Sequence, residues 1–212
     1  MKINIIFLSF ILTFSSIGLM GQSAKQNLKA GDEFFKNNKF DDAIDQYSKA
    51  LQLEPDNTKA YTQRAAAYFN LGKIKESAED YDRASVFLPK DEINFFNAGN
   101  MYYRLGDYNT ALERIKKSIE IKNNFVEAIQ LKVAALLKME RFEDALVDAK
   151  LALRYKETAE NYFYLALANE NLNKFEEAEK AYLKSLTLKS EYIDALIRLS
   201  DLLRKEKKYE LA

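Results

Sequence analysis

The chain has 212 residues with 32 basic and 32 acidic side chains, so its formal net charge is zero. A neutral chain has no overall field for nucleic acid, and we expect no nucleic-acid partner. Because cysteine and histidine are absent, disulfides, thiol chemistry, the usual zinc sites and Ser-His-Asp or Cys-His catalysis are excluded. Glycine (6) and proline (2) are scarce, which favours an all-α protein.

The first 21 residues have the pattern of a secretory signal peptide. Lys2 supplies a positive start, residues 5–14 are a compact apolar run, and Gly18 and Gly21 are small residues suited to a cleavage site. We expect cleavage after Gly21, with Gly18 or Ala24 as other positions, and export of the mature chain to the periplasm or cell envelope. The alternative is an uncleaved segment that anchors the chain in a membrane, although several polar residues weaken such a span.

The remaining chain repeats itself about every 34 residues. One ladder of large apolar residues has steps of 34, 34, 34, 33 and 34, and an Ala or Ser follows each member three residues later. Its members are Phe40, Ile74, Tyr108, Phe142, Phe175 and Tyr209. Gly72 and Gly106 can take the left-handed conformation that ends a helix, and Asn38 and Asn173 replace glycine at that turn.

This pattern resembles the tetratricopeptide repeat (TPR) family. In the best copy, the family's small, aromatic and proline positions hold Ala30, Gly31, Phe34, Ala43, Tyr47, Ala50 and Pro55. The resemblance implies an all-α, right-handed superhelical solenoid of helix-turn-helix units with about five and a half repeats. The copies are 24–57, 58–91, 92–125, 126–158, 159–192 and a partial copy at 193–212.

Each repeat is expected to form a first helix, A, a short turn and a second helix, B. Small residues such as Gly31 let the two helices approach closely, and stacking places A helices on the concave side. Acidic pairs such as Asp41-Asp42 and Glu176-Glu177 fall just inside B helices, where they stabilise the positive helix N-terminus. We find no catalytic constellation and no cofactor motif, and therefore expect no enzyme.

In this family, groove residues lie on helix A outside the packing ladders. Carried onto this chain, the groove candidates are Gln63, Phe69, Phe96, Asn97, Asn100, Tyr103, Arg104, Phe163 and Tyr164. Amide side chains can bond both the donors and the acceptors of an extended peptide, and aromatic side chains add apolar contact. The alternative for the aromatic residues is packing between adjacent A helices. The resemblance thus implies a protein or peptide partner held in the concave groove.

One subclass of the family grips C-terminal carboxylates with Lys, Asn and Arg on three A helices. The corresponding places here hold Leu28, Asp32, Gln63, Ile93 and Asn97. None of these is basic, and Asp32 would repel a carboxylate. We therefore do not expect this clamp in the first three repeats.

The last helix carries Leu196, Leu199, Leu202 and Leu203, and we expect no later helix of this chain to cover them. The leading interpretation is a non-enzymatic interaction scaffold of the cell envelope. The alternative is an N-terminal targeting or interaction module of a longer protein whose further domain is catalytic or binds the cell wall. Self-association through the uncovered end is a third possibility.

Overall fold

The structure is a computed structural model that describes residues 23–210, with side chains through Lys205. The predicted signal peptide at residues 1–21 lies outside the described residues. All regular elements of the described part are helices, which confirms the all-α prediction. Within the same part, no helix is both long enough and apolar enough to cross a membrane.

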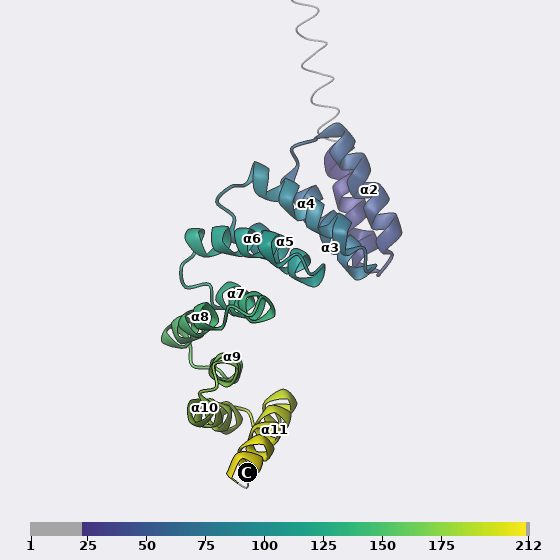
Figure 1. Ribbon diagram of the computed structural model, residues 1–212. Coiled ribbons are helices and arrows are strands. Elements are labelled where there is room, and N and C mark those ends of the chain that lie inside the picture. Colours follow the sequence, from purple (N-terminus) through teal and green to yellow (C-terminus); the bar gives the residue numbers. More distant parts are fainter. Residues whose placement is uncertain (1–22, 211–212) are drawn as a thin grey trace, which may run out of the picture. The chain divides into compact units, whose positions relative to one another are not determined.

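The chain forms two compact units, and the first unit ends at Leu105. Its helices are residues 23–36, α2 (Phe40–Leu53), α3 (Thr58–Asn70), α4 (Ile74–Phe87) and α5 (Glu92–Arg104) (Figure 1). Helix α3 packs against both α2 and α4, and α4 packs against α5. The A helix α3 therefore contacts the B helix of its own repeat and the B helix before it.

The second unit begins at Gly106. Its helices are α6 (Tyr108–Ile121), α7 (Val126–Lys138), α8 (Phe142–Tyr155), α9 (Ala159–Asn171), α10 (Phe175–Leu188) and α11 (Ile193–Glu210) (Figure 1). Each of these helices packs against the next, and α7 also contacts α9. Consecutive A helices of this unit therefore touch directly, as expected for stacked hairpins.

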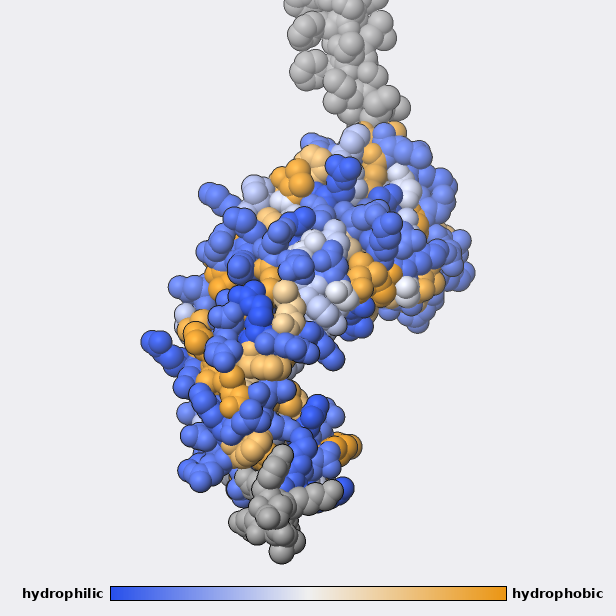
Figure 2. Space-filling model, viewed as in Figure 1, coloured by the Kyte–Doolittle hydropathy of each residue, from blue (hydrophilic) through white to orange (hydrophobic). Residues whose placement is uncertain are grey.

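Helix α11 closes the second unit only in part. Leu202 is fully buried against α10, whereas Leu196 and Leu203 are 47% and 39% exposed. The prediction of an uncovered helix is thus wrong for Leu202 and for Leu199, which packs against the same cluster, whereas Leu196 and Leu203 are exposed. On the face visible in Figure 2, hydrophobic areas of both units are interrupted by hydrophilic residues.

A residue in the left-handed conformation ends helix A in five repeats. The φ angles are 57° at Asn38, 72° at Gly72, 79° at Gly106, 57° at Glu140 and 58° at Asn173. Four of these positions confirm the prediction. Glu140 was not predicted, because glutamate has no intrinsic preference for positive φ. The repeat geometry imposes this conformation on it.

Close helix approach in the first repeat depends on Gly31. A Cβ atom added there would lie 2.5 Å from Cε1 of Tyr47, whose side chain is fully buried. The Tyr47 hydroxyl donates to Oδ1 of Asp32 at 2.9 Å. Burial, together with this bond, raises the pKa of Tyr47. The absence of a side chain at position 31 thus lets a buried tyrosine lie against the neighbouring helix.

We predict that Gly31→Ala destabilises the protein by about 1–3 kcal/mol, since overpacking outweighs the better helix propensity of alanine. The thermal midpoint measured by circular dichroism checks this. Adding Tyr47→Leu to the Gly31→Ala variant removes the clashing ring, so the alanine should then cost less than it does beside Tyr47. An equal cost in both backgrounds would contradict the packing explanation.

We predict that Glu140→Gly raises the free energy of unfolding by up to about 1 kcal/mol, because glycine avoids the left-handed penalty at some cost in backbone entropy. The matched variant is Gly72→Ala, which meets open space, since no neighbouring atom lies within 4 Å of the added Cβ. It should lower stability by about 1 kcal/mol through conformation alone. Denaturant unfolding measures both, and a loss of stability in Glu140→Gly would contradict the strain argument.

Candidate peptide-binding surface

The first unit carries seven of the nine predicted groove residues on two A helices. Gln63 and Phe69 lie on α3, and the other five lie on α5. The aromatic ring of Phe69 is 36% exposed, and the guanidinium carbon of Arg104 lies 5.0 Å from the ring centroid. This is cation–π geometry. The contact links the C-terminal ends of α3 and α5, and it places an aromatic ring and a positive charge side by side.

Polar side chains lie along the same two helices. Gln63, Asn97 and Asn100 are all half-buried. Among the described residues, no hydrogen-bond partner is found for these three side-chain amides. Each amide can therefore offer both donors and an acceptor to an incoming peptide backbone. Phe96 and Tyr103 on α5 are half-buried and already make contacts within the protein.

Five exposed basic residues lie on the A helices of the first unit. They are Lys25, Lys29, Lys36, Lys59 and Arg104. The acidic residues of these helices are Glu33, Glu92 and Asp32, and both oxygens of Asp32 are occupied. Oδ2 lies 2.9 Å from Nζ of Lys59, and Oδ1 accepts the hydroxyl of Tyr47 at 2.9 Å. The repulsion expected from Asp32 is therefore offset by Lys59, and the other four exposed basic residues outnumber Glu33 and Glu92.

Two buried asparagines that sequence reasoning missed link consecutive A helices. Thr62 donates its hydroxyl to Oδ1 of Asn94 at 3.0 Å, and Gln130 donates its amide to Oδ1 of Asn161 at 2.7 Å. Asn94 is 2% exposed and Asn161 is fully buried. The two pairs occupy equivalent repeat positions, so the recurrence of Asn at the third position of a repeat was the available signal. Thr62 and Gln130 are consequently engaged in the scaffold.

The two predicted groove residues of the second unit lie close to its core. Phe163 packs against the buried cluster of α9, α10 and α11, with ring centroids 5.0 Å from Tyr192 and 6.0 Å from Tyr182. The ring of Tyr164 lies 6.0 Å from that of Phe163. Phe163 therefore packs between helices, as the alternative interpretation of the groove aromatics held. Burial raises the pKa of its neighbour Tyr192 to about 12.

Glu170 holds the groove position that Phe69 holds in the first unit, but its side chain is only 8% exposed. One oxygen accepts the hydroxyl of Tyr182 at 2.6 Å, and the other lies 3.8 Å from Nζ of Lys205 and 4.0 Å from Arg198. Burial, together with the bond to Glu170, raises the pKa of Tyr182. Glu170 therefore links α10 and α11 within the second unit through the Tyr182 hydrogen bond and the two ion pairs.

Family comparison identifies the repeats. A model described as TPR repeat matches residues 31–72, and a model described as tetratricopeptide repeat matches residues 94–125 and 159–192. The chain is also similar to Hsp70-Hsp90 organizing protein 2 of Arabidopsis thaliana, with 29% identity over 99 residues. That match covers 47% of this chain and 17% of the plant protein. Across five organising proteins, the chain spans between 17% and 29% of their length.

Solved structures show the same fold at low sequence identity. The crystal structure of MamA protein aligns with a TM-score of 0.75 and 20% identity, over 91% of this chain and 98% of that chain. The structure of YrrB, described as a TPR protein with an unusual peptide-binding site, aligns with a TM-score of 0.75 and 18% identity, over 87% and 96% of the two chains. Both are built from the same stacked helical hairpins.

Proposed function

We propose that this chain, which is built of tetratricopeptide repeats, is a non-enzymatic scaffold that holds an extended segment of a partner protein on the A helices of its first unit. The observation that carries the proposal is the group of half-buried amides, Gln63, Asn97 and Asn100, on the same two helices as the exposed Phe69–Arg104 pair. Such amides suit a peptide backbone, whose donors and acceptors repeat along its length.

The charge of this surface favours an acidic segment. Four exposed basic side chains besides Lys59 lie on these helices, against Glu33 and Glu92, and Asp32 is occupied by Lys59 and Tyr47. Complementary charge steers association and selects between partners more than it adds affinity. An acidic segment with apolar residues between the charges would match both the basic side chains and the face of Phe69.

The similarity to organising proteins supports protein binding in general. Their name states that they organise Hsp70 and Hsp90, and YrrB is described as having a peptide-binding site. At the places of a carboxylate clamp, however, this chain has Leu28, Gln63 and Ile93 in place of basic or asparagine side chains. We therefore propose recognition along an extended segment, in place of capture of a terminal carboxylate.

We predict that a short fluorescent peptide with alternating Glu and Leu binds the full chain more tightly than its counterpart with Lys in place of Glu. The variant Lys25→Gln, Lys29→Gln, Arg104→Gln should weaken binding of the acidic peptide about tenfold, from three exposed charge contacts of under 1 kcal/mol each. The double variant Asn97→Ala, Asn100→Ala should weaken the binding of both peptides. Fluorescence anisotropy measures the affinities.

The matched control is Lys75→Gln, Arg83→Gln, Lys90→Gln, which removes three exposed charges of the first unit that lie outside the A helices. It should leave binding almost unchanged. If it weakens binding as much as the A-helix variant, the attraction is only net charge. Equal affinity for both peptides would refute the acidic segment, and wild-type binding by a folded Asn97→Ala, Asn100→Ala variant would refute the surface.

We also propose that the chain is exported to the periplasm or cell envelope. The support is the sequence pattern of residues 1–21, with Lys2 before an apolar run and Gly21 at its end. We predict that N-terminal sequencing of the chain recovered from the envelope fraction starts after Gly21. A chain that remains membrane-bound and begins at Met1 would support the anchored alternative and contradict cleavage.

A further inference from the structure

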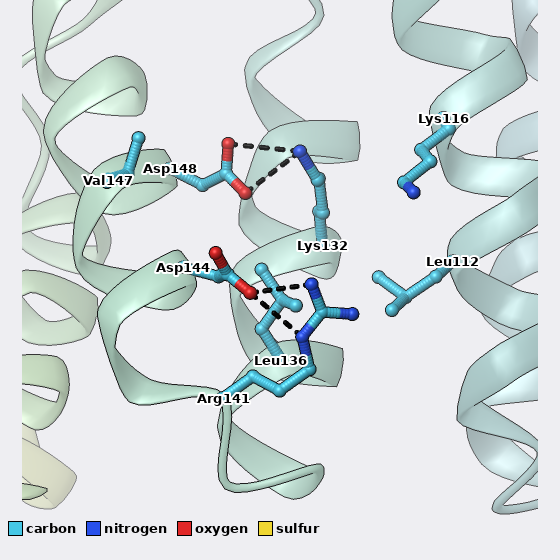
Figure 3. Close-up of a pocket in the computed structure, with 8 residues that line it drawn as sticks. All are labelled: Leu112, Lys116, Lys132, Leu136, Arg141, Asp144, Val147 and Asp148. Atoms are coloured by element: carbon cyan, nitrogen blue, oxygen red, sulfur yellow. Dashed lines mark hydrogen bonds and ion pairs between the residues drawn. The ribbon is translucent and has the colours of Figure 1, made fainter.

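The second unit contains a cavity of about 240 Å³ between α6, α7 and α8 (Figure 3). Leu112 of α6 and Leu136 of α7 supply apolar walls, and Val147 of α8 is 67% exposed. Polar side chains complete the lining: Lys116, Lys132, Arg141, Asp144 and Asp148. The cavity thus combines an apolar wall with three cations and two carboxylates.

Lys132 and Arg141 each pair with a carboxylate, but neither uses all of its N–H donors in doing so. Nζ of Lys132 lies 2.9 and 3.1 Å from the oxygens of Asp148. Arg141 directs both Nε and Nη2 at Oδ2 of Asp144, at 2.8 and 2.6 Å. Its third nitrogen points towards Leu112 across the cavity (Figure 3). Lys116 is exposed and has no acidic partner among the described residues.

The equivalent place two repeats earlier is occupied by a tyrosine ring. In the first unit, the ring of Tyr68 lies between two cations, 5.9 Å from the Arg64 guanidinium carbon and 6.0 Å from Nζ of Lys73. Arg64 also bonds Asp80 at 2.7 Å and the hydroxyl of Ser48 at 2.9 Å. The second repeat thus supplies its own aromatic side chain to the two cations.

The fourth repeat keeps the cations and lacks the ring. Sixty-eight residues after the set in the second repeat, the chain has Lys116, Lys132, Leu136, Arg141 and Asp148 in place of Ser48, Arg64, Tyr68, Lys73 and Asp80. Leucine is shorter than tyrosine, and Lys116 repels Lys132 where Ser48 accepts a bond from Arg64. The space left beside the two retained cations is large enough for an aromatic ring, since a cavity of about 150 Å³ holds benzene.

We propose that this cavity is a second binding site, which takes an aromatic side chain of a partner protein with an acidic group beside it. The ring replaces the missing tyrosine against Lys132 and Arg141, and the carboxylate pairs with Lys116. A cation held over an aromatic face stabilises such a complex by about 0.5–1 kcal/mol at exposed sites. The site lies wholly in the second unit and does not depend on the peptide surface of the first unit.

The test uses phenylacetate, cyclohexylacetate and benzyl alcohol as probes of the full chain, with methyl NMR signals of Leu112, Leu136 and Val147 as the readout. We expect phenylacetate to bind roughly two- to fivefold more tightly than cyclohexylacetate, because both carry a carboxylate and only one has a π face. Equal binding of the two acids, or no shift of these methyl signals with phenylacetate, would overturn the proposal.

Two variants separate the contributions. Leu136→Tyr restores the ring of the second repeat and should abolish phenylacetate binding. Arg141→Gln, at an exposed position, removes one of the two cations and should reduce the preference for phenylacetate over cyclohexylacetate, and this test does not depend on the tyrosine variant. A folded Leu136→Tyr protein that still binds phenylacetate, or an Arg141→Gln protein whose preference for phenylacetate is undiminished, would refute the assignment.

Lys116→Gln should weaken the binding of phenylacetate and leave the binding of benzyl alcohol unchanged, because only phenylacetate carries a negative charge that can pair with Lys116. Lys150→Gln on α8 is the matched control, since it removes another exposed lysine of the second unit that does not line the cavity. Equal weakening by both lysine variants would reduce the role of Lys116 to net charge and refute the paired carboxylate.

Discussion

The reversal of the chain after each A helix is the constraint on which the rest of the structure depends. A residue with positive φ stands at this turn in five repeats, and backbone bonds such as Lys73 N–H to the Tyr68 carbonyl, at 2.9 Å, close the helix end. Once the turn is formed, the B helix must lie back against the A helix. Small residues at the crossing then become necessary, and Gly31 beside Tyr47 is the tightest example described.

This packing uses some side chains and leaves others available for binding. Phe163 and Phe69 lie on A helices outside the ladders, yet Phe163 contacts a core cluster and Phe69 stays partly exposed beside Arg104. The difference arises from the neighbours, because Tyr182 and Tyr192 surround Phe163. A repeat position therefore has no single role, and the function proposed for the first unit does not extend automatically to the second.

Repetition also allows one part of the chain to serve as a reference for another. The cation–carboxylate pair Arg64–Asp80 recurs as Lys132–Asp148, with nitrogen–oxygen distances of 2.7 and 2.9 Å. Against this constant feature, the replacement of Tyr68 by Leu136 changes the local chemistry from a filled ring site to a cavity. Drift of a structural position in this way can produce a binding site without any change of fold.

The sequence alone determined the helical class, the spacing of the hairpins and four of the five left-handed turns, because these depend on local patterns that recur along the chain. It also placed the amides of Gln63, Asn97 and Asn100 on A helices. Only the tertiary structure showed that Asp32 forms an ion pair with Lys59, that Glu170 is buried, and that Asn94 and Asn161 link A helices. These outcomes depend on side chains brought together from different helices, and a pattern along one helix carries no record of which partner its side chains meet.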